Sequence, residues 1–342
     1  MSLNFLESLN ENQKKAVLET SGPLLILAGA GTGKTKVLTT RLANILQKKL
    51  AHPFETLTVT FTNKAASEMK QRVEEMLKVE TDGWWIGTFH AMGARILRKH
   101  PELVGLKKQF SIIDIDDQIR LVKQALSYHN VDEKRWPARL LHNIIQRWKD
   151  KALNPEDAPD DQELGNIKGK KIYRTYQDRL MTLNVVDYGD LLLQNINIFR
   201  NNPEVLSMYQ EKFKYILVDE YQDTNICQHT WLKLLTEKYK NICAVGDDDQ
   251  SIYSWRGAEV KNILKFGDTL TFINSGVTQI FKESDYKNYF RGYNNNIGNA
   301  IFKMFAIDKI EYANVFNNYG KGYKGKKVNV TSKCEKSKIE DL

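Results

Sequence analysis

The stretch LLILAGAGTGKT, residues 24–35, decides the fold of this chain. Its apolar half predicts a buried strand, and residues 37–47 after it have the pattern of a helix. The glycine-rich turn between them has the spacing of a phosphate-binding P-loop, in which backbone N–H groups and the start of the next helix point at the anion. We therefore expect Lys34 to contact the phosphates of ATP and the Thr35 hydroxyl to hold Mg²⁺.

Every residue of this loop is a candidate ligand of the nucleotide. A glycine-rich turn without a ligand is the plain alternative, and the strand and helix on either side count against it. Ala28 stands where the general pattern begins with glycine, which requires only that the backbone there avoids a positive φ angle. The candidate phosphate-binding residues are Ala28, Gly29, Ala30, Gly31, Thr32, Gly33, Lys34 and Thr35.

A second apolar run, residues 215–218, ends abruptly in Asp219 and Glu220. Because ligands of open α/β sheets bind beyond the carboxyl ends of the strands, these acids are expected beside the P-loop. Asp219 is then a partner for Mg²⁺, and Glu220 is the candidate catalytic group that orients or deprotonates the attacking water. Taken alone, two acids after a strand could equally be a helix cap.

Short runs rich in β-branched residues alternate with longer helical patterns, which is typical of a parallel sheet flanked by helices. Between about residues 114 and 206 helical patterns replace the strands. We predict an α/β fold, with a P-loop parallel sheet and an inserted helical subdomain. The clearest strands are residues 24–28, 57–62, 216–219 and 242–246. The predicted domains are a discontinuous ATP-binding domain of residues 1–91 and 207–280, a helical insertion of residues 92–206, and a basic, poorly ordered C-terminal remnant of residues 281–342.

The composition, with 42% hydrophobic and 27% charged residues, is that of a globular chain that is not embedded in a membrane. Residues 1–15 lack the pattern of a secretory signal, so we expect a cytoplasmic protein. Cys227, Cys243 and Cys334 form no CxxC pair, which argues against a zinc site or a disulfide framework and favours two core thiols and one tail thiol. The net charge of +8 is compatible with a polyanionic partner, although about half of the excess lies in residues 321–342.

A third strand end carries GDDDQSIYSWRGA, residues 246–258, and with it a specific resemblance emerges. Six segments, in order along the chain, resemble the motifs of UvrD/Rep/PcrA-type superfamily 1 DNA helicases. They are AGAGTGKT (28–35), TFTNKAASEM (60–69), GTFH (87–90), DYGDLL (187–192), VDEYQDTN (218–225) and GDDDQSIYSWRGA. The segment LNENQ (9–13) is similar to the adenine-reading Q motif of that family. The resemblance covers residues 1 to about 266 and implies a RecA-like ATP-binding domain.

The resemblance assigns roles at the nucleotide to individual residues. It implies that Gln13 contacts adenine and that Lys34 contacts the β- and γ-phosphates. It implies that Thr35 and Asp219 hold Mg²⁺ and that Glu220 positions the attacking water. ATP and Mg²⁺ are therefore the expected cofactors.

The same resemblance places Gln250 at the γ-phosphate, where it would sense the loss of that phosphate as a third catalytic residue beside Lys34 and Glu220. It also implies a neighbouring site for single-stranded DNA, and aromatic rings suit such a site because they stack on any base without reading the sequence. The candidate DNA-binding residues are Phe61, Asn63, Thr88, His90, Tyr253, Trp255 and Arg256.

Some of these residues have plainer explanations. Phe61, in a predicted strand, could be a core residue. Thr88 and His90, at a strand end, could cap a helix. We expect the adjacent Trp84 and Trp85 to be packing residues.

The function implied is that of an ATP-dependent DNA helicase that travels 3′ to 5′ along single-stranded DNA. The expected partners are single-stranded DNA or a duplex with a single-stranded tail, together with repair or replication proteins. Two other classes stay open: a non-motor module that binds nucleotide and single strands, and another P-loop enzyme such as a small-molecule kinase. The loop of residues 250–258 argues against the kinase.

The C-terminal sequence departs from the family pattern. Where the family has Gln-Asn-Tyr-Arg-Ser, residues 287–292 read KNYFRG, and the later motifs are absent. In the family a second α/β domain supplies arginines to the γ-phosphate, and arginines of this kind contribute about 10³ to 10⁵ in rate. We therefore expect a truncated form that binds ATP, hydrolyses it slowly and unwinds nothing alone.

Overall fold

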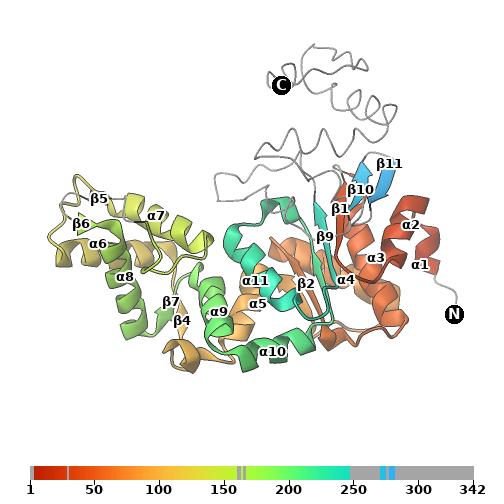
Figure 1. Cartoon of the computed structure of the whole chain (residues 1–342), viewed down its shortest axis with the longest axis horizontal. Coiled ribbons are helices and arrows are strands. Elements are labelled where there is room, and N and C mark those ends of the chain that lie inside the picture. Colours follow the sequence, from red (N-terminus) through yellow and green to blue (C-terminus); the bar gives the residue numbers. More distant parts are fainter. Residues whose placement is uncertain are drawn as a thin grey trace, which may run out of the picture. The chain divides into compact units, whose positions relative to one another are not determined.

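The computed structural model describes residues 4–28, 31–159, 163–164, 167–246, 270–274 and 277–281. A seven-stranded sheet runs through this part of the chain in the order β11-β10-β1-β9-β8-β2-β3 (Figure 1). Its strands are β1 (Leu24–Ala28), β2 (Thr56–Thr60), β3 (Trp85–Thr88), β8 (Tyr215–Val218), β9 (Ile242–Gly246), β10 (Leu270–Asn274) and β11 (Val277–Phe281).

The strands β1, β9, β8, β2 and β3 pair in parallel. Ile26 of β1 lies opposite Val245 of β9, and Val59 of β2 lies opposite Val218 of β8. Both β2 and β9 are buried along their whole length, which explains why they read as continuous apolar and β-branched runs instead of alternating ones. Because the strands are parallel, their carboxyl ends meet at one edge of the sheet, and the residues that follow them become neighbours.

Helices bury their apolar sides against this sheet. One hydrophobic core joins α2, α3 and α4 to the strands, with Val37, Met69, Leu217 and Val245 among its members. The helices are α1 (Asn4–Glu7), α2 (Glu11–Leu18), α3 (Lys34–Gln47), α4 (Asn63–Leu77), α5 (Phe89–Leu97), α10 (Pro203–Lys212) and α11 (Ile226–Thr236), and the 3₁₀ turns are η1 (Pro53–Glu55), η2 (Pro101–Val104) and η3 (Tyr221–Asp223).

A second hydrophobic core belongs to helices inserted between β3 and β8. Leu121, Ile145 and Tyr176 represent α6, α7 and α8 in this core. The helix α9 contacts α7 of this group and also α5, α10 and α11, so it joins the insertion to the sheet domain (Figure 1). The inserted elements are β4 (Ser111–Ile112), α6 (Ile115–Tyr128), α7 (Ala138–Asp150), β5 (Glu163–Leu164), β6 (Ile167–Lys168), α8 (Gly169–Leu183), β7 (Val185–Val186) and α9 (Asp190–Asn201).

The predicted α/β fold class, with a parallel sheet and a helical insertion, is confirmed. The strand predicted at residues 57–62 was drawn too long, because Thr62 leaves β2 to cap α4 and its hydroxyl accepts the N–H of Ala65 at 3.1 Å. The domain boundaries stay a prediction. Residues 247–269 and 282–342, which include most of the predicted C-terminal remnant, lie outside the described residues.

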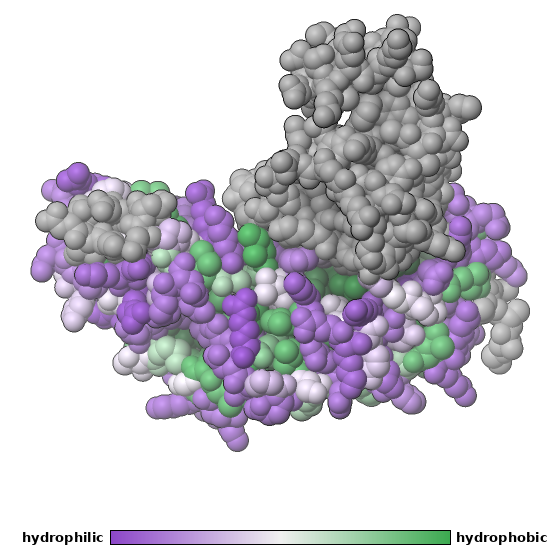
Figure 2. Space-filling view, in the orientation of Figure 1, coloured by the Kyte–Doolittle hydropathy of each residue, from purple (hydrophilic) through white to green (hydrophobic). Residues whose placement is uncertain are grey.

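Hydrophilic residues dominate the face of the molecule drawn in Figure 2, and apolar residues form smaller groups between them. No helix within the described ranges combines the length and the apolar character that a membrane crossing requires. Trp84 and Trp85 are buried, as expected of packing residues, and the Arg95 guanidinium lies 3.9 Å from the centre of the Trp85 ring. Cys227 and Cys243 are buried free thiols, while Cys334 lies outside the described residues.

Candidate nucleotide site and its neighbouring face

The P-loop connects β1 to α3 in the way its sequence predicts. Gly31 and Gly33 have φ angles of +73° and +85°, a left-handed conformation that glycine adopts without steric cost. Gly33 is the N-cap of α3, and Lys34 is its first, largely buried residue. The N-terminus of α3 therefore lies directly after the tight turn, which is where a phosphate group would be bound. Gly29 and Ala30 lie outside the described residues.

Gln13 lies against this loop. Its backbone N–H donates to Asn10 Oδ1 at 2.8 Å, and its Oε1 accepts the N–H of Asn10 at 3.1 Å, so the side chain is fixed at the start of α2. Its Nε2 group then donates to the carbonyl oxygen of Thr32 at 2.8 Å. A side chain at Gly33 would lie only 3.2 Å from the same Nε2 group. The segment predicted to read adenine is thus held at the P-loop.

Asp219 lies next to the other residue that is predicted to hold Mg²⁺. Thr35 Oγ1 donates to Asp219 Oδ2 at 3.2 Å, although the two residues are far apart in the sequence. Burial, and then the neighbouring Glu220, raises the pKa of Asp219 to about 6. A hydroxyl and a carboxylate are oxygen ligands of the kind that Mg²⁺ prefers when phosphates and water complete its shell. The residues present therefore fit that ion.

Glu220 has a strained backbone, with a φ angle of +51°. A left-handed non-glycine residue costs about 1 kcal/mol or more, and such strain is often found at functional sites. Glu220 Oε2 accepts a hydrogen bond from Gln222 Nε2 at 2.7 Å, which orients the carboxylate. Asp223, at the end of η3, was not singled out from the sequence, yet burial, followed by Glu220, raises its pKa to about 6. Asp219, Glu220 and Asp223 form an acidic turn after β8.

The strand β9 lies between the P-loop strand β1 and the acidic strand β8. Its last residue, Gly246, is crowded, because a side chain there would lie 2.9 Å from Gln222 Oε1. The strand β9 therefore ends between the two halves of the nucleotide site, and Gln250 follows β9 closely in the sequence. The predicted residues Gln250, Tyr253, Trp255 and Arg256 themselves lie outside the described residues.

The candidate DNA residues that the structure describes follow β2 and β3, beside β8 at the same edge of the sheet. Phe61 is half-buried, with its ring edge-on to Phe89 at 5.4 Å between centroids, so part of it does belong to the core. Asn63 is exposed at the start of α4. Thr88 caps α5, with its hydroxyl accepting the N–H of Ala91 at 3.2 Å, which is the plainer of its two explanations.

His90 is half-buried on α5, and burial lowers the pKa of its imidazole. Its ring lies edge-on to Tyr188 at 5.9 Å between centroids. Tyr188 is 56% exposed, and it was not singled out from the sequence. The sequence feature that could have indicated it is its place in DYGDLL, between Asp187 and Asp190. Phe61, Asn63 and His90 thus follow β2 and β3 at the sheet edge that also carries Asp219, and Tyr188 contacts His90.

Comparison with known proteins agrees with this arrangement. The family model described as UvrD/REP helicase N-terminal domain matches residues 9–271. The chain belongs to the UvrD/Rep helicase family. It is 52% identical over 288 residues to a probable DNA helicase II homolog of Rickettsia felis, which covers 83% of this chain and 43% of the relative. It is 44% identical over 283 residues to an ATP-dependent DNA helicase PcrA of Staphylococcus aureus, covering 82% and 38% of the two chains.

The chain spans about two-fifths of the length of these relatives. Within this member of the UvrD/Rep family, the structure brings Gln13 against the P-loop and Thr35 against Asp219, at the carboxyl ends of β1 and β8. Their roles stay predictions, as do those of Glu220 and of the residues described after β2 and β3.

Proposed function

We propose that this chain binds ATP with Mg²⁺ at the P-loop and single-stranded DNA on the neighbouring face, as the ATP-binding part of a 3′ to 5′ DNA helicase. The contact between Thr35 Oγ1 and Asp219 Oδ2 is the observation that carries the proposal. It sets a hydroxyl that follows one strand against a carboxylate that follows another, at the strand edge where nucleotides bind.

Thr35 and Asp219 would hold Mg²⁺, which when bound neutralises negative charge on the phosphate oxygens. Lys34, at the N-terminus of α3, would bind the β- and γ-phosphates, and Gln13 would contact the adenine base. Glu220, oriented by its hydrogen bond from Gln222, would align water with the γ-phosphate and accept its proton.

Single-stranded DNA would lie across the ends of β2 and β3. Phe61 and Tyr188 offer aromatic rings, and stacking of a base on such a ring contributes about 1 to 3 kcal/mol without sequence preference. Asn63 and His90 offer polar groups for the DNA backbone. A motor that steps along every sequence needs binding of this kind. Tyr253, Trp255 and Arg256 are further candidates for the same strand.

Coupling between the two ligands would pass through the segment that leaves β9. Gln250 is the candidate sensor of the γ-phosphate, and the DNA candidates Tyr253 to Arg256 follow it closely in sequence. Loss of the γ-phosphate would then change the affinity for the DNA strand, and repeated cycles of hydrolysis would move the protein along it. We propose separation of a tailed duplex during DNA repair or replication as the outcome, in the cytoplasm, with proteins of those processes as partners.

We expect the 342-residue polypeptide, tested by itself, to hydrolyse ATP slowly. The family match stops at residue 271, and the resemblance implies arginines from a second α/β domain. Turnover stimulated by single-stranded DNA should stay below about 1 s⁻¹, the lower end of ordinary enzyme rates. Faster turnover that Lys34→Ala abolishes would contradict the slow-turnover expectation and would still support the helicase assignment.

The test is a titration of a fluorescent ADP analogue and of labelled oligo-dT. Lys34→Ala should weaken nucleotide binding by about 1.5 to 3 kcal/mol, the contribution of a charged hydrogen bond. Lys48→Ala, an exposed lysine directly after α3, is the matched control and should bind like the wild type. Equal nucleotide affinity of all three proteins would refute the P-loop assignment.

Two further results would select the other function classes. Binding of both ligands without any strand-dependent movement, even when the chain is joined to the remaining length of a relative, would favour a non-motor module. A rate of ATP turnover that is unaffected by DNA and increases when a small phosphate acceptor is added would favour a kinase.

A further inference from the structure

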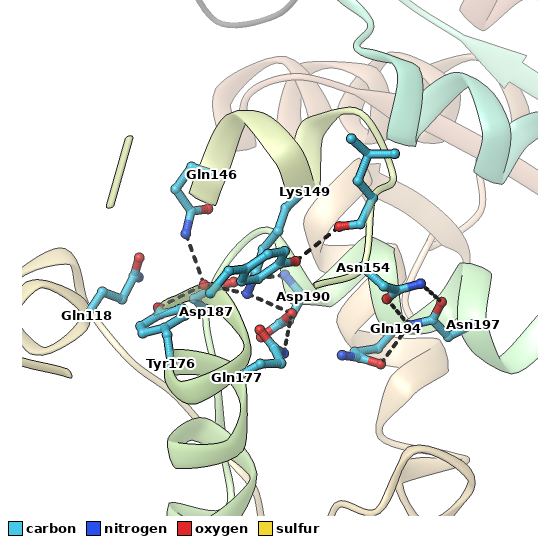
Figure 3. Close-up of polar contacts among 12 residues, drawn as sticks. Gln118, Gln146, Lys149, Asn154, Tyr176, Gln177, Asp187, Asp190, Gln194 and Asn197 are labelled. Carbon is cyan, nitrogen blue, oxygen red and sulfur yellow. Dashed lines mark hydrogen bonds and ion pairs between the residues drawn. The ribbon is translucent and has the colours of Figure 1, made fainter. Parts of the chain in front are cut away.

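The residues DYGDLL (187–192) carry a buried ionic cluster for which the proposed function has no use. The ammonium group of Lys149, near the end of α7, lies 2.7 Å from Asp187 Oδ2 and 2.8 Å from Asp190 Oδ1, and none of the three side chains has exposed surface (Figure 3). A buried charge is costly to leave without its partner, so α7 cannot shift against the start of α9 without breaking these contacts. We call these three residues the Lys149 cluster.

Side chains of α8 complete the Lys149 cluster (Figure 3). The Tyr176 hydroxyl donates to Asp187 Oδ2 at 2.9 Å, and Gln177 Nε2 donates to Asp190 Oδ1 at 2.9 Å. The backbone N–H of Asp190 also donates to Asp187 Oδ1 at 2.9 Å. Three helices of the insertion therefore share one polar junction, and the end of α7 is fixed by it.

The next residue of α7, Asp150, contacts the segment between the acidic turn and α11. Asn225 Nδ2 donates to Asp150 Oδ1 at 2.7 Å. Asn225 Oδ1 accepts the N–H of Gln228 at 2.8 Å and so caps α11. Asn225 closely follows η3, the turn whose N-cap is Glu220. One side chain therefore joins the segment directly after the acidic turn to the end of α7.

The same motif also lies against the candidate DNA face. Tyr188, between the two acids of the Lys149 cluster, contacts His90 through its ring. Asn195 of α9 donates to the carbonyl oxygen of Gly93 in α5 at 3.0 Å, so the two helices are tied together. A strand that displaced either ring would act on the segment that holds the end of α7.

We propose that Asp150 and Asn225 are positioning residues that transmit strand binding at His90 and Tyr188 to the acidic turn of the nucleotide site. This inference rests on the proposed function, because it requires both ligands. The path is continuous, from Tyr188 through the Lys149 cluster to the end of α7 and on to α11. By linkage, the strand must change nucleotide affinity by the same factor as the nucleotide changes strand affinity.

Two substitutions separate positioning from simple support of the fold. Asn225→Asp keeps an N-cap oxygen for α11, because Asp caps helices as well as Asn does, but it sets a carboxylate against Asp150. Adding Asp150→Asn restores the hydrogen bond in the opposite direction, because the amide at position 150 then donates to the carboxylate at position 225. The matched control is Asn154→Asp, which disturbs the amide pair with Asn197 inside the insertion without touching the acidic turn (Figure 3).

The assay measures the affinity of the full chain for a fluorescent ADP analogue with Mg²⁺, with and without saturating oligo-dT. In the wild type we expect the strand to change this affinity at least about fivefold, the lower end of ordinary allosteric coupling. In Asn225→Asp the factor should fall below about twofold, with the DNA-free affinity kept within about twofold of the wild type. The double variant should recover the wild-type factor, and Asn154→Asp should never lose it.

Wild-type coupling in Asn225→Asp would overturn the proposal, and so would a double variant that stays uncoupled while Asn154→Asp behaves like the wild type. If the wild type binds ADP but no oligo-dT, the proposed function itself fails. If it binds both ligands without mutual effect, only the positioning role is overturned.

Discussion

Replacement of Lys149 by methionine removes the only positive charge of the Lys149 cluster while keeping much of the side-chain volume. The two carboxylates that remain, Asp187 and Asp190, have no exposed surface. Water therefore cannot solvate them in the folded state, and each would have to stay ionised without its partner or take up a proton. We expect Lys149→Met to destabilise the fold strongly at neutral pH.

The magnitude follows from the burial of the pair. Removing one partner of a buried ion pair costs about 3 to 5 kcal/mol. Burial, and then Asp187, already raises the pKa of Asp190 to about 6. Without the lysine the pKa of Asp190 moves further up, and the pKa of Asp187, which burial raises but the contacts with Lys149 hold below its ordinary value, moves above that value. The stability of the variant is therefore present at low pH and is lost as the pH rises. We expect the full 3 to 5 kcal/mol at about pH 8 and roughly half of it at about pH 5.5.

Urea unfolding followed by tryptophan fluorescence measures this loss, compared at the two pH values. Arg120→Met is the matched control, because its ion pair with Asp117 is nearly as short, at 2.9 Å, but the side chains are 74% and 49% exposed. An exposed pair contributes about 0 to 1 kcal/mol. The reasoning is refuted if Lys149→Met loses no more stability than Arg120→Met, or if its loss is independent of pH.

Three further predictions concern the site and the helix packing. Burial, and then Glu220, raises the pKa of Asp219 to about 6, so the affinity for ADP with Mg²⁺ should fall as the pH drops below that value. In a titration with a fluorescent ADP analogue, Asp219→Asn should remove both this pH dependence and the effect of Mg²⁺ on affinity. Gln13→Glu keeps an acceptor for the N-cap but loses the donor to the Thr32 carbonyl, and the same titration should show about 1 kcal/mol weaker binding. Gly93→Ala would set a methyl group 2.6 Å from the carbonyl oxygen of Leu191 in α9. Urea unfolding should then show a free energy of unfolding that is lower by about 1 to 3 kcal/mol. An unchanged urea midpoint would mean that α5 and α9 can move apart without cost.

The strands and the P-loop could be predicted from local sequence. The strand at residues 242–246 was predicted with the bounds that the structure has, and the run at 24–28 likewise. Apolar runs bounded by glycine or acids report burial and backbone shape, which depend on near neighbours in the chain. The predicted strand 57–62 ended early for an equally local reason, since Thr62 is a good N-cap for the helix that follows.

The meeting of Thr35 with Asp219 could be anticipated only by adding a fold to the motifs. Once a parallel sheet was assumed, both residues had to follow strands at one edge. The order of the strands, with β9 between β1 and β8, was beyond local pattern, because it depends on how the chain crosses over the sheet.

The sequence by itself determined the class of the sheet, the P-loop and the residue types of the nucleotide site, because these arise from periodicity and turn chemistry over a few residues. Only the tertiary structure decided that Lys149 forms ion pairs with Asp187 and Asp190, and that the ring of Tyr188 contacts that of His90. A lysine on an amphipathic helix normally reaches solvent, and nothing in its own helix says which distant acids will cover it. The partners of Lys149 are determined when the helices pack against one another. Packing removes water from the polar groups, and a buried charge without a partner is too costly to be stable.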